Sequence, residues 1–224
     1  MRLRERIGIT PKRQDQLSRL LQLCLVGFLF VGLYELNLGI VVNSLLGILV
    51  TGLPALLERD YQIPMDAGLT LWITAAVFLH TFGTVGLPGM EGTVYQSIWW
   101  WDHITHALSA SLVGAAGYAT VRAIDEHVGD LAFPPRFAFA FILTVTLAFG
   151  VAWEIVEFAI GGLTSIIGVS ATLIQYSVHD TILDLVFNII GAVIVALWGT
   201  VYLSGVTDAI VSRLEARAER FTDK

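Results

Sequence analysis

Residues 20–57 read LLQLCLVGFLFVGLYELNLGIVVNSLLGILVTGLPALL, a stretch in which Glu35 is the only charged residue. A helix needs about 20 mainly apolar residues to cross a bilayer. The stretch is long enough for two such helices, and Asn37 marks a tight turn between them. It therefore predicts one membrane-spanning helix at Leu20–Leu36 and a second at Leu38–Leu57.

Four further stretches of the chain have the same length and apolar character. They lie at Leu69–Leu87, Ile104–Ile124, Phe137–Ile160 and Thr181–Ser204. Charged residues make up only 14% of the chain and apolar residues 55%, whereas roughly a quarter of a typical soluble domain is charged. The predicted fold class is therefore all-α, a polytopic membrane helix bundle with six transmembrane helices.

The six spans divide the chain into three parts. Residues 1–19 form a basic N-terminal arm, residues 20–204 the transmembrane domain, and residues 205–224 a C-terminal tail. No convincing cleavage site follows the first span, which we therefore expect to be an uncleaved span and not a signal peptide. Apolar residues of the tail recur near helical spacing, so it is either a helix on the membrane surface or the solvated end of the sixth span.

The basic residues predict the orientation of the bundle. Six of the thirteen Lys and Arg residues lie in the N-terminal arm and four in the C-terminal tail, and the others are Arg59, Arg122 and Arg136. Six spans place all of these segments on one side of the membrane. Since positive residues favour the cytoplasmic side, we expect a multi-pass protein of the cell membrane with both termini cytoplasmic.

Charge and cysteine content exclude some classes of function. The formal charge is −6 and no basic stripe occurs, so no nucleic-acid partner is expected. Cys24 is the single cysteine, which excludes an internal disulfide. The partner that the composition does predict is membrane lipid.

Acidic residues and histidines gather at the extracytoplasmic ends of the predicted spans. Residues three or four positions apart share one face of a helix, and a polar face in an apolar helix normally turns toward the bundle interior. No Lys or Arg is in reach, so a proton or a metal ion is expected to neutralise the carboxylates. The spacing holds for Asp102 and His106, for Glu154 and Glu157, and for Asp180, Asp184 and Asn188.

Several of these polar residues also have structural explanations. Asp102 and Asp180 stand where predicted helices begin, so each is also a candidate N-cap. His103 and His179 are at the interface and fit a plain surface role. His80 is a lone histidine on an apolar helix, and a hydrogen-bonded packing role suits it better than a ligand role.

Glu154, Glu157, His106 and Asp184 are harder to explain structurally. The two glutamates are expected near a helix C-terminus, where the helix dipole disfavours negative charge. His106 and Asp184 are expected about one turn inside the membrane. We therefore predict that these four residues belong to a functional site.

Carboxylates mixed with imidazoles suit a divalent metal ion such as zinc, manganese or iron. The alternative without metal is a cluster of carboxylates that share protons. Glu154 and Glu157 are the candidate catalytic residues because a glutamate can act as general base on a bound water. The candidate metal ligands are Asp102, His106, Glu154, Glu157, Asp180 and Asp184, with His80, His103, His179 and Asn188 as weaker candidates.

The fourth span and the extracytoplasmic loops carry further expectations. The stretch from Ser109 to Gly117 is rich in small residues, which let helices approach closely in lipid, so this span is expected near the bundle centre. The loops Gly83–Trp101 and Gly161–His179 are too apolar for free solvated loops, and we expect them to fold back over the helix ends. The Trp99–Trp101 run is typical of an interfacial aromatic belt.

Three motifs carry a resemblance to a known family. The chain resembles the YjdF-like family of multi-spanning inner-membrane proteins from the third span onward, and it is more faintly similar to VanZ-like membrane proteins. The resemblance implies the architecture and the site residues Asp102/His106, Glu154/Glu157 and Asp180/Asp184, but it implies no reaction. The motifs are WDHITH at 101–106, WEIVE at 153–157, and DTILD at 180–184 with NIIGA at 188–192.

Three functions are compatible with this sequence. The first is a metal-dependent enzyme acting on a lipid or lipid-linked substrate. The second is a cation or proton transporter, although the inner halves of the spans are poor in polar groups. The third is a non-catalytic membrane component that the polar cluster stabilises.

Overall fold

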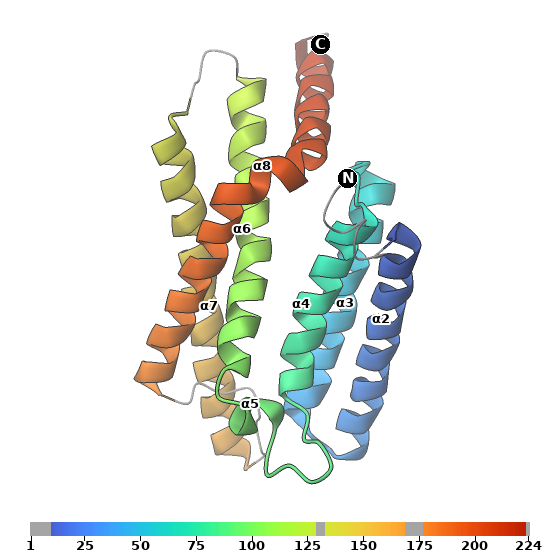
Figure 1. Ribbon diagram of the computed structural model, residues 1–224, viewed down its shortest axis with the longest axis vertical. Helices are drawn as coiled ribbons and strands as arrows, with labels where there is room; N and C mark the ends of the chain where they lie inside the picture. The colour runs from blue at the N-terminus through green and yellow to red at the C-terminus, as the bar shows by residue number, and fades with distance from the viewer. Residues whose placement is uncertain (1–9, 129–132, 169–176, 223–224) are drawn as a thin grey trace.

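The computed structural model describes residues 10–128, 133–168 and 177–222, which form helices and, within those ranges, no strand (Figure 1). The predicted all-α fold class is confirmed. The helices are α2 (Pro11–Tyr34), α3 (Leu38–Tyr61), α4 (Ala67–Gly83), α5 (Val94–Ser97), α6 (Trp101–His127), α7 (Pro135–Ile167) and α8 (Val178–Thr222).

Five of these helices are long and apolar enough to cross a membrane: α2, α3, α6, α7 and the first part of α8, Val178–Leu197. The predicted third span corresponds to α4, which has 17 residues and is therefore at the lower limit for a spanning helix. Its C-terminal end is Gly83, four residues before the predicted Leu87. The helix stops there because the hydroxyl of Thr84 bonds back to the carbonyl of Thr81 and the chain turns away.

The helices form two groups of three. In the N-terminal unit α2, α3 and α4 pack against one another, and in the C-terminal unit α6, α7 and α8 do the same. The units meet through α4 and α6, and the short helix α5 contacts both of these (Figure 1). Within the described residues α3 packs against neither α6 nor α7, so the two units are not in close contact along their whole length.

Helix α6 lies at the centre of the arrangement, as its small residues predict. It contacts α4, α5, α7 and α8, and it packs most extensively against α8. Gly191 of α8 lies so close to α6 that a Cβ there would collide with the carbonyl oxygen of Ala107. A buried apolar core forms where these helices meet, consisting of Ala115, Tyr118, Ile142, Ala192, Val195 and Leu203.

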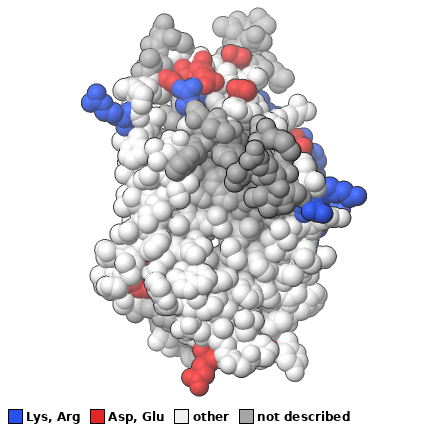
Figure 2. All heavy atoms as spheres, viewed as in Figure 1, with Lys and Arg blue, Asp and Glu red and all other residues white. Residues whose placement is uncertain are grey.

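The two ends of the bundle differ in charge. We call the end at which α5 lies the α5 end, and the opposite end the basic end. In Figure 2 the visible Lys and Arg side chains of the described residues lie toward the basic end, whereas the lower part of that face shows acidic but no basic side chains. Among them, Arg122 pairs with Asp125 and Glu126 where α6 ends.

The loop 84–100 covers the α5 end of the helices. Thr93 and Gln96 form a reciprocal capping box that starts α5. The ring of Tyr95 lies directly against Gly83, where a Cβ would collide with it. This loop therefore folds back as the sequence predicts, whereas residues 169–176 of the second loop lie outside the described residues and Gly161–Ile167 continue α7.

The tail continues α8 as a helix to Thr222, and it reaches the end of α3. Arg213 donates to the backbone carbonyl of Asp60 at 3.2 Å. Its guanidinium also lies 5.5 Å from the ring centroid of Tyr61. These contacts join the C-terminal part of α8 to the end of α3, and so link the two units at the basic end.

Candidate functional site

Two carboxylates and an imidazole converge between α6 and α8 near the α5 end. The Nε2 atom of His106 lies 3.5 Å from Oδ1 of Asp102 and 3.9 Å from Oδ1 of Asp184. Each residue offers one ligand atom, and these atoms lie within 4.8 Å of one another. We call Asp102, His106 and Asp184 the His–Asp cluster.

The cluster is mostly buried, although the side chain of Asp102 is 20% exposed. Asp184 is 1% exposed and His106 is 6% exposed. The Oδ1 atom of Asp184 has no hydrogen-bond partner within the described part of the chain, although two imidazoles surround it. Buried carboxylates are normally hydrogen-bonded or bound to a cation, so this oxygen needs neutralisation by an imidazole, a proton or a cation.

His103 belongs to the same group of side chains. Its Nδ1 lies 3.7 Å from Oδ1 of Asp184, and its ring stacks on Phe187 with centroids 4.6 Å apart. The sequence favoured a surface role and a ligand role for His103 about equally. The stacking on Phe187 and the short distance to Asp184 place the imidazole against α8.

The two candidate N-caps are not caps. Trp100 occupies the N-cap position of α6, and Asp102 is the second residue of the helix, within its first turn. The hydroxyl of Ser177 accepts from the backbone N–H of Asp180 and so takes the capping role for α8. Asp102 is thus left available for His106, its neighbour at i+4.

Glu154 and Glu157 lie well inside α7, and the expectation that they sit near its C-terminus is wrong. The helix continues for ten residues beyond Glu157 because Gly161 and Gly162 do not end it, so the dipole argument does not apply. Both glutamates are buried, at 5% and 8% exposure. The charged form of these glutamates is energetically unfavourable because the carboxylates are buried, and not because they lie near a helix end.

Each glutamate has one oxygen fixed by a hydrogen bond. Glu157 accepts from the indole Nε1 of Trp153 at 3.0 Å, and Glu154 accepts from the hydroxyl of Thr181 at 2.8 Å. The second oxygen of Glu154, Oε1, is buried and has no hydrogen-bond partner among the described residues. The Thr181 contact also ties α7 to α8 beside the cluster.

These acids lie close enough to repel one another. Asp184 experiences the charges of Asp102, Asp180, Glu154 and Glu157. The ion pairs that Arg59 and Arg122 make lie at the basic end. Within the part of the chain that the structure describes, no Lys or Arg side chain pairs with the cluster, so neutralisation has to come from imidazoles, protons or a cation.

A second polar network joins α4 and α6 through α5. The hydroxyl of Tyr95 lies 2.8 Å from Nδ1 of His80 and 3.3 Å from the hydroxyl of Thr105. Thr105 in turn donates to the backbone carbonyl of Asp102 at 2.8 Å. Nothing in the sequence pointed to Tyr95 or Thr105, because a tyrosine in a loop and a threonine in a helix are both common.

Tyr95 lies outside the membrane-spanning helices, and burial of its hydroxyl raises its pKa above the ordinary value of 10.0. It is therefore a neutral phenol at physiological pH. His80 keeps its packing role through this network, and its ring also meets Trp153 at 5.1 Å between centroids.

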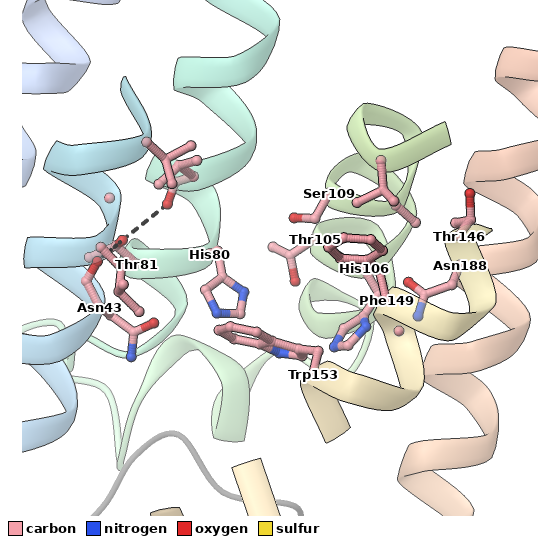
Figure 3. A pocket seen from close by; sticks show the side chains of 17 residues that line it. Asn43, His80, Thr81, Thr105, His106, Ser109, Thr146, Phe149, Trp153 and Asn188 are labelled. Carbon is pink, nitrogen blue, oxygen red and sulfur yellow. Dashed lines mark hydrogen bonds between the residues drawn. The ribbon is translucent and has the colours of Figure 1, made fainter. Parts of the chain in front are cut away.

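A cavity of about 300 Å³ lies between the two units and begins beside the cluster. Figure 3 shows His80, Trp153 and His106 in neighbouring positions at its polar end, with Asn188 close to His106. The rest of the wall is mainly apolar and includes Leu46, Val50, Val77, Val113 and Phe149.

The remaining predicted ligands are placed less centrally. Asn188 is 3% exposed and hydrogen-bonds to His106. Gly150 makes room for it, since a Cβ there would collide with the Asn188 amide. His179 is exposed, and it lies outside the group of close ligand atoms.

A family model for predicted membrane proteins, DUF2238, matches residues 17–205. The chain belongs to this family. The match covers all of the helices that form the site, and it is consistent with the resemblance to YjdF-like proteins; the fainter VanZ-like similarity stays an expectation. Neither the curated proteins nor the solved structures contain a significant match to the chain.

Proposed function

We propose that this multi-pass membrane protein is a metal-dependent enzyme that acts on a lipid or lipid-linked substrate. The His–Asp cluster would hold a divalent ion such as zinc, manganese or iron. The observation that carries the proposal is the Oδ1 atom of Asp184, which is buried, has no hydrogen-bond partner among the described residues, and faces two imidazole nitrogens at 3.7 and 3.9 Å.

The separations within the cluster fit a shared ion better than direct hydrogen bonds. Side-chain hydrogen bonds of the N–H···O type are about 2.7–3.2 Å long. Two ligand atoms that are each about 2.1 Å from a tetrahedral ion lie roughly 3.4 Å apart. The distances from His106 Nε2 to the two carboxylates, 3.5 and 3.9 Å, are close to the second value.

The chemistry that such an ion supplies is the activation of a water molecule or the polarisation of a carbonyl or phosphoryl oxygen. Glu154 is the proposed general base, since Thr181 holds one of its oxygens and leaves Oε1 without a hydrogen bond. Trp153 holds Glu157 in a fixed position beside it. This division of roles would leave one glutamate to move a proton and the other to orient the substrate or the ion.

A transport role has less support from the packing. The layer between the cluster and the basic end is the buried apolar core around Tyr118, Ile142 and Val195. An ion crossing the bilayer needs polar groups along its whole path. The site therefore resembles a recess that the apolar core closes toward the basic end, which favours an enzyme over a cation or proton transporter.

The proposed location is the cell membrane, with both termini in the cytoplasm and the α5 end outside. The support is the positive-inside rule applied to the basic end. The site would then act on the outer leaflet or on a substrate presented there.

The direct test is metal analysis of the purified protein. We expect about one divalent ion per chain by elemental analysis, and re-binding of Zn²⁺ or Mn²⁺ after chelation. Asp184→Asn is expected to weaken that binding at least a hundredfold. Asp66→Asn is the matched control, because Asp66 caps α4 at the basic end and Asn caps equally well.

The proposal is wrong if the wild-type protein binds neither ion, or if Asp184→Asn binds as tightly as Asp66→Asn. The enzymatic part is tested separately in vesicles of mixed phospholipids, with released products followed by mass spectrometry. Glu154→Gln should retain its metal and lose about 10²–10⁴-fold in turnover.

A further inference from the structure

The cavity between the two units has the shape and lining of a binding site for a lipid chain. Its volume of about 300 Å³ is within the range of small-molecule sites. Its walls come from α3 and α4 on one side and from α6, α7 and α8 on the other, so neither unit forms it alone.

One end of the cavity is polar and the remainder is apolar. His106, a member of the His–Asp cluster, lines the polar end together with His80 and Asn188. Val113 follows His106 by seven residues on the same helix, which is about 10 Å at a rise of 1.5 Å per residue. The cavity thus extends from the cluster into the apolar middle of the bundle.

Two polar atoms in the cavity wall have no hydrogen-bond partner within the described residues. These are Nε2 of His80 and the hydroxyl of Thr146, which is 1% exposed. Buried polar atoms of this kind are normally satisfied. A ligand oxygen beside His80, which a lipid ester at the polar end of the cavity would place there, would supply a partner for that imidazole.

The cavity opens sideways, toward the lipid. Leu46 of α3 and Phe149 of α7 both line it, and yet they are 44% and 62% exposed. They stand at the gap where α3 and α7 make no contact. In a membrane the surroundings of such an opening are acyl chains, and no charged or aqueous route is needed to enter it.

We propose that this cavity binds one acyl chain of a membrane phospholipid, which enters between α3 and α7 and places its ester and head group against His80 and His106. The inference rests on the proposed function, since it names the substrate class of the same site. The occupant is a lipid and not a peptide, because the opening faces the bilayer and its wall is smooth and apolar.

The test uses the full-length protein in nanodiscs of phosphatidylethanolamine and phosphatidylglycerol, with a phosphatidylglycerol that carries a diazirine in one acyl chain. After illumination we expect adducts at Val77 or Trp153, which line the cavity and are only partly exposed. Adducts confined to outward-facing residues such as Leu23 and Phe30, which are 70% and 66% exposed, would overturn the inference.

Cavity-filling variants give a second readout. Val50→Trp and Val113→Trp fill the cavity from opposite walls, and each should reduce the phospholipid retained in detergent, measured by native mass spectrometry, at least tenfold. Leu49→Trp is the matched control, because Leu49 is the neighbour of Val50 and is 70% exposed. Equal retention by all three variants would contradict the proposal.

Metal content separates the two proposals. Asp184→Asn should lose the ion and still give adducts in the cavity, whereas Val113→Trp should keep the ion and lose the lipid. If the wild-type protein binds no metal but still gives adducts in the cavity, the proposed metal-dependent enzyme is wrong and the lipid-binding cavity stands. If the protein binds metal but gives no adducts in the cavity, only the proposal of a bound acyl chain is wrong.

Discussion

At the residue scale, the orientation of the His106 imidazole depends on the side chains that surround it. Its Nε2 faces Asp102 and Asp184, and Asn188 hydrogen-bonds to the same imidazole. A partner of this kind fixes the orientation of a metal-binding histidine, and its loss typically costs 10–100-fold in metal affinity.

We therefore predict that Asn188→Leu weakens Zn²⁺ binding about 10–100-fold without unfolding the protein. Isothermal titration of the chelator-treated protein measures the change. Asn43→Leu is the control, because Asn43 lines the same cavity but bonds to the backbone of Gly39. Equal affinities of the two variants would exclude Asn188 as the residue that orients His106.

Tyr95 gives a prediction about pH. The pKa of Tyr95 is raised in the folded protein. Its contribution to the free energy of unfolding is therefore fully present below the unfolded-state pKa of 10.0, and this stability is lost as the pH rises above 10.0. One such group contributes a slope of up to about 1.4 kcal/mol per pH unit. The free energy of unfolding should fall less steeply above pH 10 in Tyr95→Phe than in the wild type. Parallel slopes would show that Tyr95 ionises freely in the folded protein.

At the element scale, α6 and α8 pack with almost no space between their backbones. Gly191→Ala should place a methyl group against the carbonyl of Ala107 and lower the free energy of unfolding by about 1–3 kcal/mol. SDS titration in mixed micelles measures it. Gly27→Ala in α2 is the control, since nothing lies within 4 Å of its added Cβ. A fully tolerated Gly191→Ala would mean that the two helices can separate at no cost.

The elements themselves were largely readable from hydropathy. Length and apolar composition located every long helix, and the small residues of the Ser109–Gly117 stretch correctly predicted that α6 is central. Helix ends were missed where the signal is weak. The predicted span ended at Ile160, just before Gly161 and Gly162, but a glycine inside a long helix is tolerated. The division into two units was not predicted, because helix contacts depend on complementary side-chain packing and not on hydropathy.

The site was predictable in part. The spacing of three and four residues predicted that Asp102, His106 and Asp184 lie on helix faces turned toward the bundle interior. The structure brings these three side chains together. Thr181 was missed even though it directly follows Asp180, because a threonine near a helix start is usually read as local capping. Tyr95 was missed since nothing in a loop sequence shows which helix the loop will cover.

At the scale of the whole molecule, both termini of the described chain lie toward the basic end. Cys24 is the single cysteine, so a Cys24→Ser background allows topology to be mapped. We predict that Glu91→Cys, in the loop at the α5 end, reacts with a membrane-impermeant maleimide in intact cells. Asp208→Cys, in the part of α8 near the basic end, should react only after permeabilisation. The reverse pattern would invert the proposed orientation.

The apolar core that closes the recess below Asn188 has one more consequence. A cavity that opens sideways into lipid returns its contents to the leaflet from which they came. If a phospholipid is cleaved there, both fragments re-enter the same monolayer, and the reaction would change the composition of one leaflet while leaving the other untouched. Such an enzyme would create an imbalance between the two sheets of lipid that a separate flippase has to correct.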